Sequence, residues 1–546
     1  MAEEKTGTAA ENSNTAKATG IIGIAVMLSR ILGLARDMFM YRLFGTTAFA
    51  DCFNLAFKIP NLLRDLFAEG ALSQAFVTTF SKRLKEEGEK SAWQLANKVL
   101  SLAVVFMSLV TIVGVIIAPW IVDLLLSFAD NSFGPSERNL IVLLTRIMYP
   151  FILIVSLSAL VMGMLNARNI FGMPALASCF FNLGCIIGGG VIGYWLDPKW
   201  GEKSLIGISI GVLIGGMAQL VVQFPSLWKV GFRPRWDGAW RDGGVKKILS
   251  LMLPAVIAAS AVQVNVMVNA MFATSTGAGG VTALNYAFRL MQLPIGMFGV
   301  AVATITLPAL SRAAIGSIGK YFAPTLTRGM NMITILVLPS CIGLSFLAVP
   351  LVTLLFNKGP SDMQGTMMIA GALQAYAYGL LFYSWMKVVQ PAFYAIDKRW
   401  IPMLVSFLSI VLNFGLNWYF VRVKGWGHES LALTTSLLAV LNFSLLFASL
   451  RKLTGGLGTP AILNTLWRCA IAALVMGSLC YLANKFLLQD LSSVILILRW
   501  LLVGAVIGVV AIVYFGLCYV LGVREARDCI GMVLRHIPGL KKFAPK

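Results

Sequence analysis

Long apolar runs, separated by short polar or charged segments, fill the chain from residue 21 to residue 521. A helix that crosses a bilayer needs about 20 mostly apolar residues, whereas membrane β-strands alternate and read as weakly apolar. The pattern therefore predicts an all-α polytopic membrane protein with about 14 transmembrane helices. The predicted spans are residues 21–45, 50–80, 95–128, 139–166, 174–196, 205–228, 248–274, 281–311, 324–356, 364–394, 401–421, 430–450, 462–487 and 494–521.

The composition agrees with a membrane protein and excludes a water-soluble enzyme or a disordered chain. Of the 546 residues, 58% are hydrophobic and 12% are charged, against about 45–50% apolar and about 25% charged in soluble domains. The net charge is +21, from 44 Lys and Arg against 23 Asp and Glu. Nucleic-acid binding is the simplest interpretation of such a charge. In a membrane protein, basic cytoplasmic loops and an anion inside the helix bundle explain it better, so no nucleic-acid partner is expected.

Basic residues are concentrated in alternate loops, and this predicts the orientation. Clusters of Lys and Arg follow the second, sixth, tenth and twelfth spans and occupy the C-terminal tail. Because basic loops stay in the cytoplasm, both termini should be cytoplasmic and the number of spans should be even. The polar N-terminal segment, followed by a charged first span, does not resemble a cleavable signal peptide. The basic tail is either solvated or lies on anionic lipid, and the sequence leaves both readings open.

An internal repeat divides the chain into two halves. Residues 29–58 match residues 260–289 at a constant offset of 231, and the best piece pairs residues 54–58 with residues 285–289. Six spans per copy predict two lobes of the same orientation with a cavity between them, plus two additional helices. The predicted organisation is a polar cytoplasmic tail (1–20), an N-lobe (21–228), a basic linker (229–247), a C-lobe (248–450), spans 13 and 14 outside the repeat (462–521) and a basic tail (522–546).

Charged residues inside the first two spans and the eighth span are the candidate functional groups. A charge at the bilayer centre costs about 2.5–3.5 kcal/mol on insertion scales, so such residues are usually functional or paired. Arg289 has no acid in its own span, and a guanidinium in a cavity suits phosphate oxygens. A functional role is favoured for Arg36, Arg64 and Arg289. The candidates in the first two spans are Ser29, Arg30, Arg36, Asp37, Asp51, Lys58, Arg64 and Glu69.

A structural role remains open for part of this set. At about 100° per residue, Asp51, Lys58, Asp65 and Glu69 fall on one narrow stripe of the second span, and Arg64 projects about 120° away. This stripe would suit an arginine of the first span. An ion-pair ladder between spans one and two is therefore an equal alternative for three of these residues, namely Asp51, Lys58 and Asp65.

Other residue types do not indicate catalysis. The eight Cys form no CxxC pair and mostly lie in apolar stretches, so they predict buried thiols and no metal site. The two His are far apart in sequence, and no Walker motif is present, so ATP is not the direct energy source. The glycines at 188–190 and 215–216 lie inside apolar spans and predict close helix packing or helix kinks, not phosphate-binding loops. No cofactor is therefore expected.

The charged segments are long enough to carry a family resemblance. They read Ser29-Arg30-x-Leu32-Gly33-x-x-Arg36-Asp37, Phe57-Lys58-x-Pro60-Asn61-Leu62-Leu63-Arg64 followed by Ala68-Glu69-Gly70-Ala71-x-Ser73-x-Ala75-Phe76, Tyr286-Ala287-x-Arg289-Leu290-x-x-Leu293-Pro294, and Lys387-Val388-x-x-Pro391-Ala392-Phe393-Tyr394-Ala395. Together they resemble the MurJ (MviN) family of lipid II flippases, over nearly the whole chain. Two departures concern Asp65, where some relatives carry a basic residue, and Phe288, where some carry an acid.

The resemblance implies a function in peptidoglycan synthesis. Members of this family, within the multidrug/oligosaccharidyl-lipid/polysaccharide exporter superfamily, move the undecaprenyl-diphosphate-linked precursor lipid II from the cytoplasmic to the outer leaflet of the bacterial inner membrane by alternating access. The resemblance also implies that the two extra helices, here spans 13 and 14, form a hydrophobic groove for the lipid tail. The resemblance places Arg30, Arg36, Arg64 and Arg289 at the cavity arginines, and Asp37, Asp51 and Glu69 at important acids. Membrane potential or an unidentified ion gradient would drive transport, and cell-wall synthesis enzymes are further candidate partners.

Two alternatives remain open from the sequence. One is an exporter of another polyprenyl-linked oligosaccharide or of a cationic drug, although a drug carrier would need an acidic cavity. The other is a non-transporting membrane scaffold that docks cell-wall enzymes through its basic loops.

Overall fold

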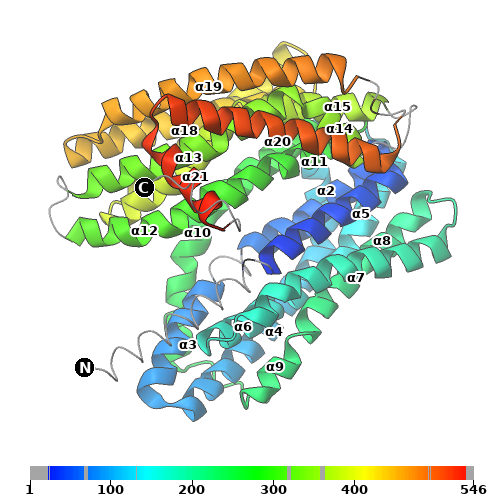
Figure 1. Cartoon of the computed structure of the whole chain (residues 1–546). Helices are drawn as coiled ribbons and strands as arrows, with labels where there is room; N and C mark the ends of the chain where they lie inside the picture. Colours follow the sequence, from blue (N-terminus) through cyan, green and yellow to red (C-terminus); the bar gives the residue numbers. More distant parts are fainter. Residues whose placement is uncertain are drawn as a thin grey trace. The chain divides into compact units, whose positions relative to one another are not determined.

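The computed structural model describes residues 23, 25–66, 72–130, 132–315, 321–356, 363–489, 491 and 494–536. Within these ranges every regular element is helical, so the all-α prediction is confirmed (Figure 1). Contacts divide the chain into two units, Met1–Thr274 and Ser275–Lys546. The first unit contains a helix over residues 25–44, α2 (Ala48–Arg64), α3 (Ser73–Glu87), α4 (Glu89–Leu125), α5 (Pro135–Met148), α6 (Phe151–Ala167), α7 (Gly172–Leu196), α8 (Glu202–Val221), α9 (Phe224–Lys229) and α10 (Gly243–Ala273).

The second unit begins with the counterpart of α2 and ends with helices that have no counterpart in the first. It contains α11 (Gly280–Pro294), the π-helical turn η2 (Ile295–Gly299), α12 (Val300–Ile315), α13 (Ala323–Phe346), α14 (Ala348–Phe356), α15 (Met363–Ala377), α16 (Leu380–Ala395), α17 (Trp400–Asn417), the π-helical turn η5 (Trp418–Val423), α18 (Glu429–Thr454), α19 (Thr459–Phe486), α20 (Leu496–Val520) and α21 (Arg524–His536).

Twelve of the fourteen predicted spans correspond to helices of membrane-crossing length. Among the described residues, eleven helices are long and apolar enough to cross a bilayer, and the bent pair α15–α16 makes a twelfth. These are predicted spans three to fourteen. The first two do not meet the same criterion, because helix 25–44 carries four charged residues and α2 has only 17 residues. The count of fourteen therefore stays a prediction.

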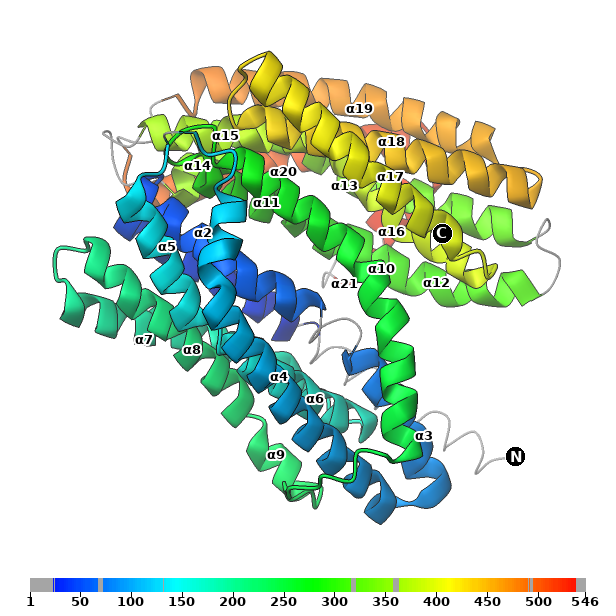
Figure 2. The ribbon, with the colours of Figure 1, turned by 180° about the vertical axis from the view of Figure 1, so that it is seen from behind.

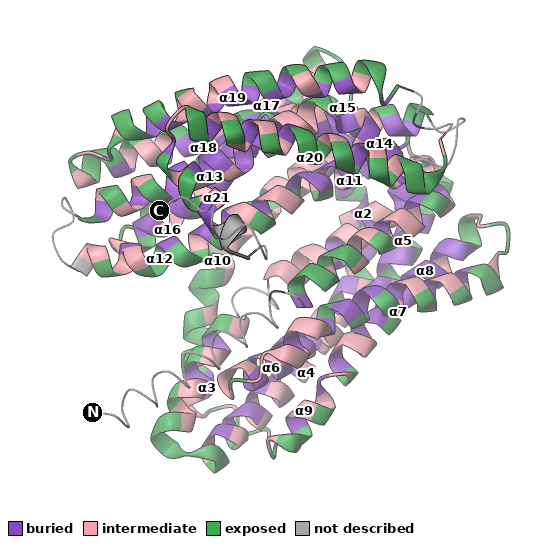
Figure 3. Ribbon diagram, in the orientation of Figure 1, coloured by how far each residue is buried: buried purple, intermediate pink, exposed green. Residues whose placement is uncertain are grey.

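The outer faces of these helices are apolar, as a lipid solvent requires. On α4, Leu109, Ile112, Ile116 and Trp120 are all exposed at helical spacing and form a continuous stripe. Figure 3 shows exposed and buried residues alternating around α19 and α20 in the same way. A contiguous exposed apolar face of this size is avoided in soluble monomers, so these helices are built to contact acyl chains.

The same helix pairs pack together in both units, which gives the repeat a structural basis. In the first unit α2 packs on α5, α3 on α6, and α6 on both α4 and α8. In the second unit the equivalent pairs are α11 on α15, α12 on α16, and α16 on both α13 and α18. One further equivalent pair, α7–α8 in the first unit and α17–α18 in the second, also lies side by side (Figure 2).

Helix breaks also recur at equivalent positions. The chain breaks between α5 and α6 at Pro150, and the equivalent break between α15 and α16 bends the second pair by 46°. A π-helical turn follows Arg64 in the first unit, and another follows Pro294 in the second. Such turns widen the helix locally and are frequent at functional sites.

The boundary between the two units lies later in the chain than the lobe boundary that the sequence repeat predicts. The predicted C-lobe begins at residue 248, but α10 contacts α3 and α4 and is grouped with the first unit. The cause is the polar junction at the start of α10, described below, which ties this helix to the first unit. The repeat compares sequence copies, whereas contacts report where a helix packs, so the two divisions need not coincide.

Glycines bring α7 and α8 into direct backbone contact. A Cβ atom on Gly211 would overlap the backbone of Gly189, and a Cβ on Gly184 would lie 2.6 Å from the Cα of Gly215. This confirms that the predicted glycine clusters serve helix packing. The pair forms a rigid wall, and α7 carries the residues that position the charged helix 25–44.

Candidate functional site: charged helices of the first unit

Side chains of α7 hold helix 25–44 in place by donating hydrogen bonds to backbone carbonyls of that helix. The Asn182 Nδ2 amide donates to the carbonyl oxygen of Ser29 at 3.2 Å, and the Cys179 thiol donates to the carbonyl of Ala25 at 3.7 Å. Gly33 lies opposite Asn182, where a Cβ would have ordinary van der Waals contact. The Ser29–Arg36 segment therefore has a fixed position on the glycine-packed wall.

Arg36 lies over an aromatic ring and beside an acid. Its Cζ atom is 5.6 Å from the centre of the Phe181 ring, and its Nε and Nη2 groups donate to Asp37 Oδ1 at 3.3 and 3.1 Å. The side chains are 15% and 8% exposed. A cation above a ring and beside a carboxylate is stabilised by both, so the guanidinium has a fixed orientation.

Aromatic rings connect this arginine to the second charged helix. Phe181 of α7 packs on Phe151 of α6 at 5.5 Å, and Phe151 packs on Phe57 of α2 at 6.0 Å. Lys58, which follows Phe57, is half-buried. A continuous row of aromatic side chains therefore leads from Arg36 of helix 25–44 to Phe57 of α2.

Arg64 and Asp65 form a second pair at the end of α2. Arg64 donates to Asp65 Oδ1 from Nε at 3.2 Å and from Nη2 at 2.8 Å, with 22% and 33% of the two side chains exposed. Asp65 thus pairs within α2, and not with helix 25–44 as the ladder interpretation expects. Arg64 directly precedes Asp65 in sequence. Its side chain is long enough to contact the Asp65 carboxylate although the two residues project from the helix in different directions.

The remaining predicted residues have different environments. Asp51 is fully buried in the first turn of α2, where the positive end of the helix dipole favours a carboxylate. Arg30 is exposed on helix 25–44, and Arg289 is exposed on α11 of the second unit. Glu69 lies outside the described residues. That the arginines of the two units share one cavity stays a prediction.

Sequence reasoning missed the residues of α7 that position Arg36. Asn182 and Phe181 lie in a helix that reads as almost entirely apolar. A single Asn in such a helix was an available signal, because a buried amide needs partners.

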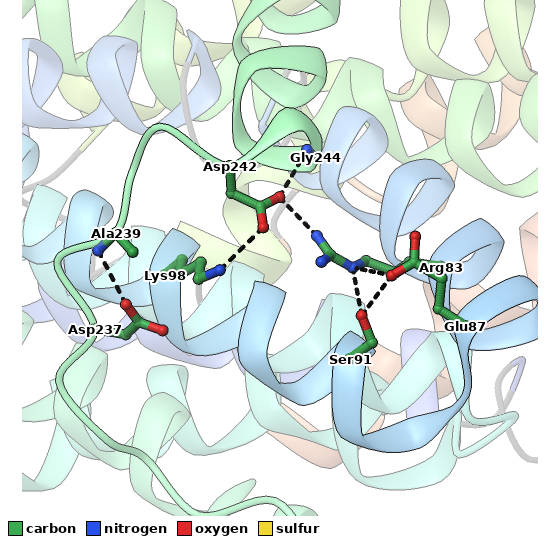
Figure 4. Close-up of polar contacts among 8 residues, drawn as sticks. All are labelled: Arg83, Glu87, Ser91, Lys98, Asp237, Ala239, Asp242 and Gly244. Atoms are coloured by element: carbon green, nitrogen blue, oxygen red, sulfur yellow. Dashed lines mark hydrogen bonds and ion pairs between the residues drawn. The ribbon is translucent and has the colours of Figure 1, made fainter.

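Sequence reasoning also missed a polar junction at the start of α10 (Figure 4). Asp242 caps this helix by accepting from the Gly244 amide at 2.8 Å. The same carboxylate accepts from Arg83 Nη1 of α3 at 2.6 Å and from Lys98 Nζ of α4 at 2.9 Å. Arg83 Nε in turn donates to Glu87 and Ser91. Asp242 thereby joins the start of α10 to two consecutive helices, α3 and α4, that lie far earlier in the sequence.

The positive charges at this junction lower the pKa of the Asp242 carboxyl group. The hydrogen bond from Arg83, together with those from Lys98 and the Gly244 amide, holds the pKa of Asp242 well below its ordinary value, although partial burial opposes the shift. A lowered folded-state pKa means that the stabilisation is fully present above the unfolded value, about 3.9, and is lost as pH falls through the folded pKa.

Replacing Asp242 with Asn should loosen α10 from the first unit. At neutral pH the free energy of unfolding should fall by about 1.5–3 kcal/mol, because charged hydrogen bonds to Arg83 and Lys98 are lost. The difference from the unmodified protein should narrow only in acid, below about pH 4, where Asp242 of the unfolded chain binds a proton while the folded carboxylate, with its lowered pKa, stays ionised. Thermal unfolding of the detergent-purified protein across pH measures this. Asp237→Asn is the control, because that side chain caps only the nearby Ala239 amide. Equal effects of both substitutions would contradict the prediction.

Comparisons with known proteins identify close relatives. A family model described as lipid II flippase MurJ matches residues 40–502. A Burkholderia cenocepacia protein named lipid II flippase MurJ is 34% identical over 507 residues, covering 92% of this chain and 96% of its own. A Vibrio cholerae protein named probable lipid II flippase MurJ is 32% identical over 523 residues, covering 92% and 95%.

Solved structures give the same fold. A structure described as lipid II flippase MurJ in an inward closed conformation has a TM-score of 0.72 at 25% identity, covering 91% of this chain and 98% of its own. An inward-facing multidrug resistance transporter of the MATE family, in the MOP superfamily, has a TM-score of 0.67 at 15% identity, covering 80% and 98%. The second likeness shows the fold alone.

Proposed function

The chain belongs to the lipid II flippase MurJ family, and from this membership we propose how its charged residues move the substrate. The resemblance found in the sequence is confirmed, and the protein is a flippase and transporter, not an enzyme. Lipid II is its substrate. We propose in addition the roles of individual residues, transport from the cytoplasmic to the outer leaflet, a driving force and an orientation in the membrane.

The arginines are proposed to bind the diphosphate of lipid II. The observation that supports this is the fixed position of Arg36, which Phe181 and Asp37 orient. A guanidinium held in this way presents paired N–H donors that match two phosphate oxygens. Arg30, Arg64 and Arg289 would complete the site, with Ser29, Asp51, Lys58 and Glu69 in support.

Asp37 and Asp65 are proposed to hold their arginines while no substrate is bound. Each accepts hydrogen bonds from the arginine directly before it. A diphosphate carries more negative charge than one carboxylate and has oxygens on two phosphorus atoms, so it would replace the carboxylates at the edges of several guanidinium groups at once. The lobes would then alternate between access from the two sides, and the π-helical turns beside Arg64 and Pro294 are candidate points of movement.

The polyprenyl tail is proposed to stay outside the lobes, along α19 and α20. These two helices pack together and against α13, and they keep exposed apolar residues such as Leu474, Phe486 and Ile512. A hydrocarbon tail on this surface avoids the polar path of the head group. The membrane potential could drive the step, since each charge moved across 100 mV is worth about 2.3 kcal/mol; an ion gradient is the other source, with the ion unidentified.

We propose that both termini are cytoplasmic in a bacterial inner membrane. Supporting this, Arg83 and Lys98 of one basic loop region contact Asp242 of another, so both regions lie on the same side of the first unit. Reporter fusions at residues 90, 240 and 451 should all give a cytoplasmic signal. An external signal at residue 240 would contradict this orientation.

Depletion and rescue tests the proposed function directly. A strain depleted of its own flippase should accumulate lipid II in the inner leaflet, and this chain should restore both growth and the appearance of lipid II in the outer leaflet. Restored growth without translocation would indicate a scaffold for cell-wall enzymes. Translocation of another polyprenyl-linked oligosaccharide, with lipid II left inside, would replace the substrate.

A further inference from the structure

A pocket lies beneath the segment that connects α9 to α10. Its volume is about 270 Å³, and its walls come from α4, α6, α8 and α9 of the first unit. Residues 230–242 form its roof and contribute Phe232, Pro234, Arg235 and Trp236. The proposed transport site does not use this pocket.

The interior of the pocket is apolar, because its polar side chains are already hydrogen-bonded to the backbone of the connecting segment. Asn97 accepts from the Arg235 amide at 2.9 Å and donates to the Arg233 carbonyl at 3.5 Å. Ser101 accepts from the Asp237 amide at 3.0 Å. What remains facing the space is apolar, and includes Leu100, Val104, Leu157 and Val161.

The edge of the pocket is cationic and aromatic. Arg235 is exposed, and within the described residues no acid forms an ion pair with its guanidinium. Trp236 is 67% exposed, and Trp228 nearby is 51% exposed. Tryptophans in such positions are typical of the membrane–water interface. An arginine beside them suits a phosphate at head-group level.

The local charge balance favours an anion. The segment 229–247 carries six basic residues and two acids. One of these acids, Asp242, is occupied by Arg83 and Lys98, and the other, Asp237, accepts from the Ala239 amide. A positively charged edge and an apolar interior are together complementary to an anionic amphiphile.

We propose that this pocket binds one acyl chain of an anionic phospholipid, with the lipid phosphate on Arg235. A volume of about 270 Å³ is near the lower end of ligand pockets, so it accommodates part of one chain and leaves the second chain in the bilayer. The lipid would support the segment that connects α9 to α10 within the first unit. Because the ligand binds only the folded form, it stabilises the protein by mass action.

The test is lipid binding to the full-length protein in mild detergent, measured by native mass spectrometry and by the shift in thermal unfolding temperature. The probes are dioleoyl phosphatidylglycerol and dioleoyl phosphatidylcholine, which have identical chains. Phosphatidylglycerol should bind more tightly, and Arg235→Gln should weaken its binding by about tenfold. Equal binding of the two lipids would overturn the proposal.

Matched variants locate the site. Arg241→Gln removes the same charge from the same segment, outside the pocket, and should leave binding unchanged. Val104→Trp should fill the pocket and reduce the binding of both lipids, with its unfolding temperature in the absence of lipid as the check on folding. If Arg235→Gln and Arg241→Gln reduce lipid binding equally, general surface charge explains the binding and the proposed site is refuted.

Two further probes separate the occupant from other sources of phosphate. Inorganic phosphate alone should give no stabilisation, because the chain supplies the hydrophobic contact. Undecaprenyl phosphate should not displace phosphatidylglycerol at equal concentration. Stabilisation by inorganic phosphate would identify a free-anion site, and displacement by the polyprenyl lipid would assign the pocket to the substrate; either result overturns the proposal.

Discussion

Arg64→Ala should abolish lipid II transport while leaving the amount of protein in the membrane nearly unchanged. The ion pair with Asp65 is partly exposed, so its loss should cost about 0–1 kcal/mol of stability. Loss of a bidentate contact to diphosphate should instead reduce transport by about a hundredfold or more. Arg64→Lys should rescue only in part, because it keeps the charge without the planar fork. Complementation of a flippase-depleted strain, with immunoblotting of the membrane fraction, measures both quantities.

Asp65→Asn is the matched control for this experiment. It breaks the same ion pair but leaves the guanidinium in place. If Arg64 serves only to neutralise Asp65, then the two substitutions should have equal effects. If Arg64 binds substrate, Asp65→Asn should retain transport. A functional Arg64→Ala/Arg289→Ala double variant would remove these arginines from the mechanism.

Gly211→Ala should lower the amount of folded protein, the second large effect that we expect. A methyl group at this position would overlap the backbone of Gly189, and backbone atoms cannot rotate away. Extra methyl groups in packed cores typically cost about 1–3 kcal/mol, and separating α7 from α8 should place this site at or above that range. The readouts are abundance in the membrane and the unfolding temperature in detergent.

Gly504→Ala in α20 is the control for the glycine experiment. A Cβ at Gly504 meets no atom within 4 Å, so the same chemical change should be neutral or slightly stabilising through helix propensity. An unchanged unfolding temperature for Gly211→Ala would show that the wall formed by α7 and α8 separates without cost. It would also weaken the argument that this wall fixes the position of Arg36.

Hydrophobic runs in the sequence predicted spans three to fourteen because hydropathy is a local property that a single helix carries by itself. The first two spans did not meet the same criterion, because the charges that mark the site also interrupt the apolar runs. The repeat was also visible, since equivalent residues such as Lys58 and Arg289 keep their spacing. The α7 glycines could be assigned to packing, but their partner helix could not be identified.

The sequence by itself determined the helical membrane class, the twelve apolar spans, the duplicated pattern and the family motifs. Only the tertiary structure decided which side chains meet. It placed Arg36 over Phe181, 145 residues away, and joined Arg83, Lys98 and Asp242 at one helix start. The physical reason is that helical periodicity shows which face of a helix is buried, but not which helix covers it. Ion pairs and ring contacts depend on which helix covers that face, and this is decided by packing across the whole unit.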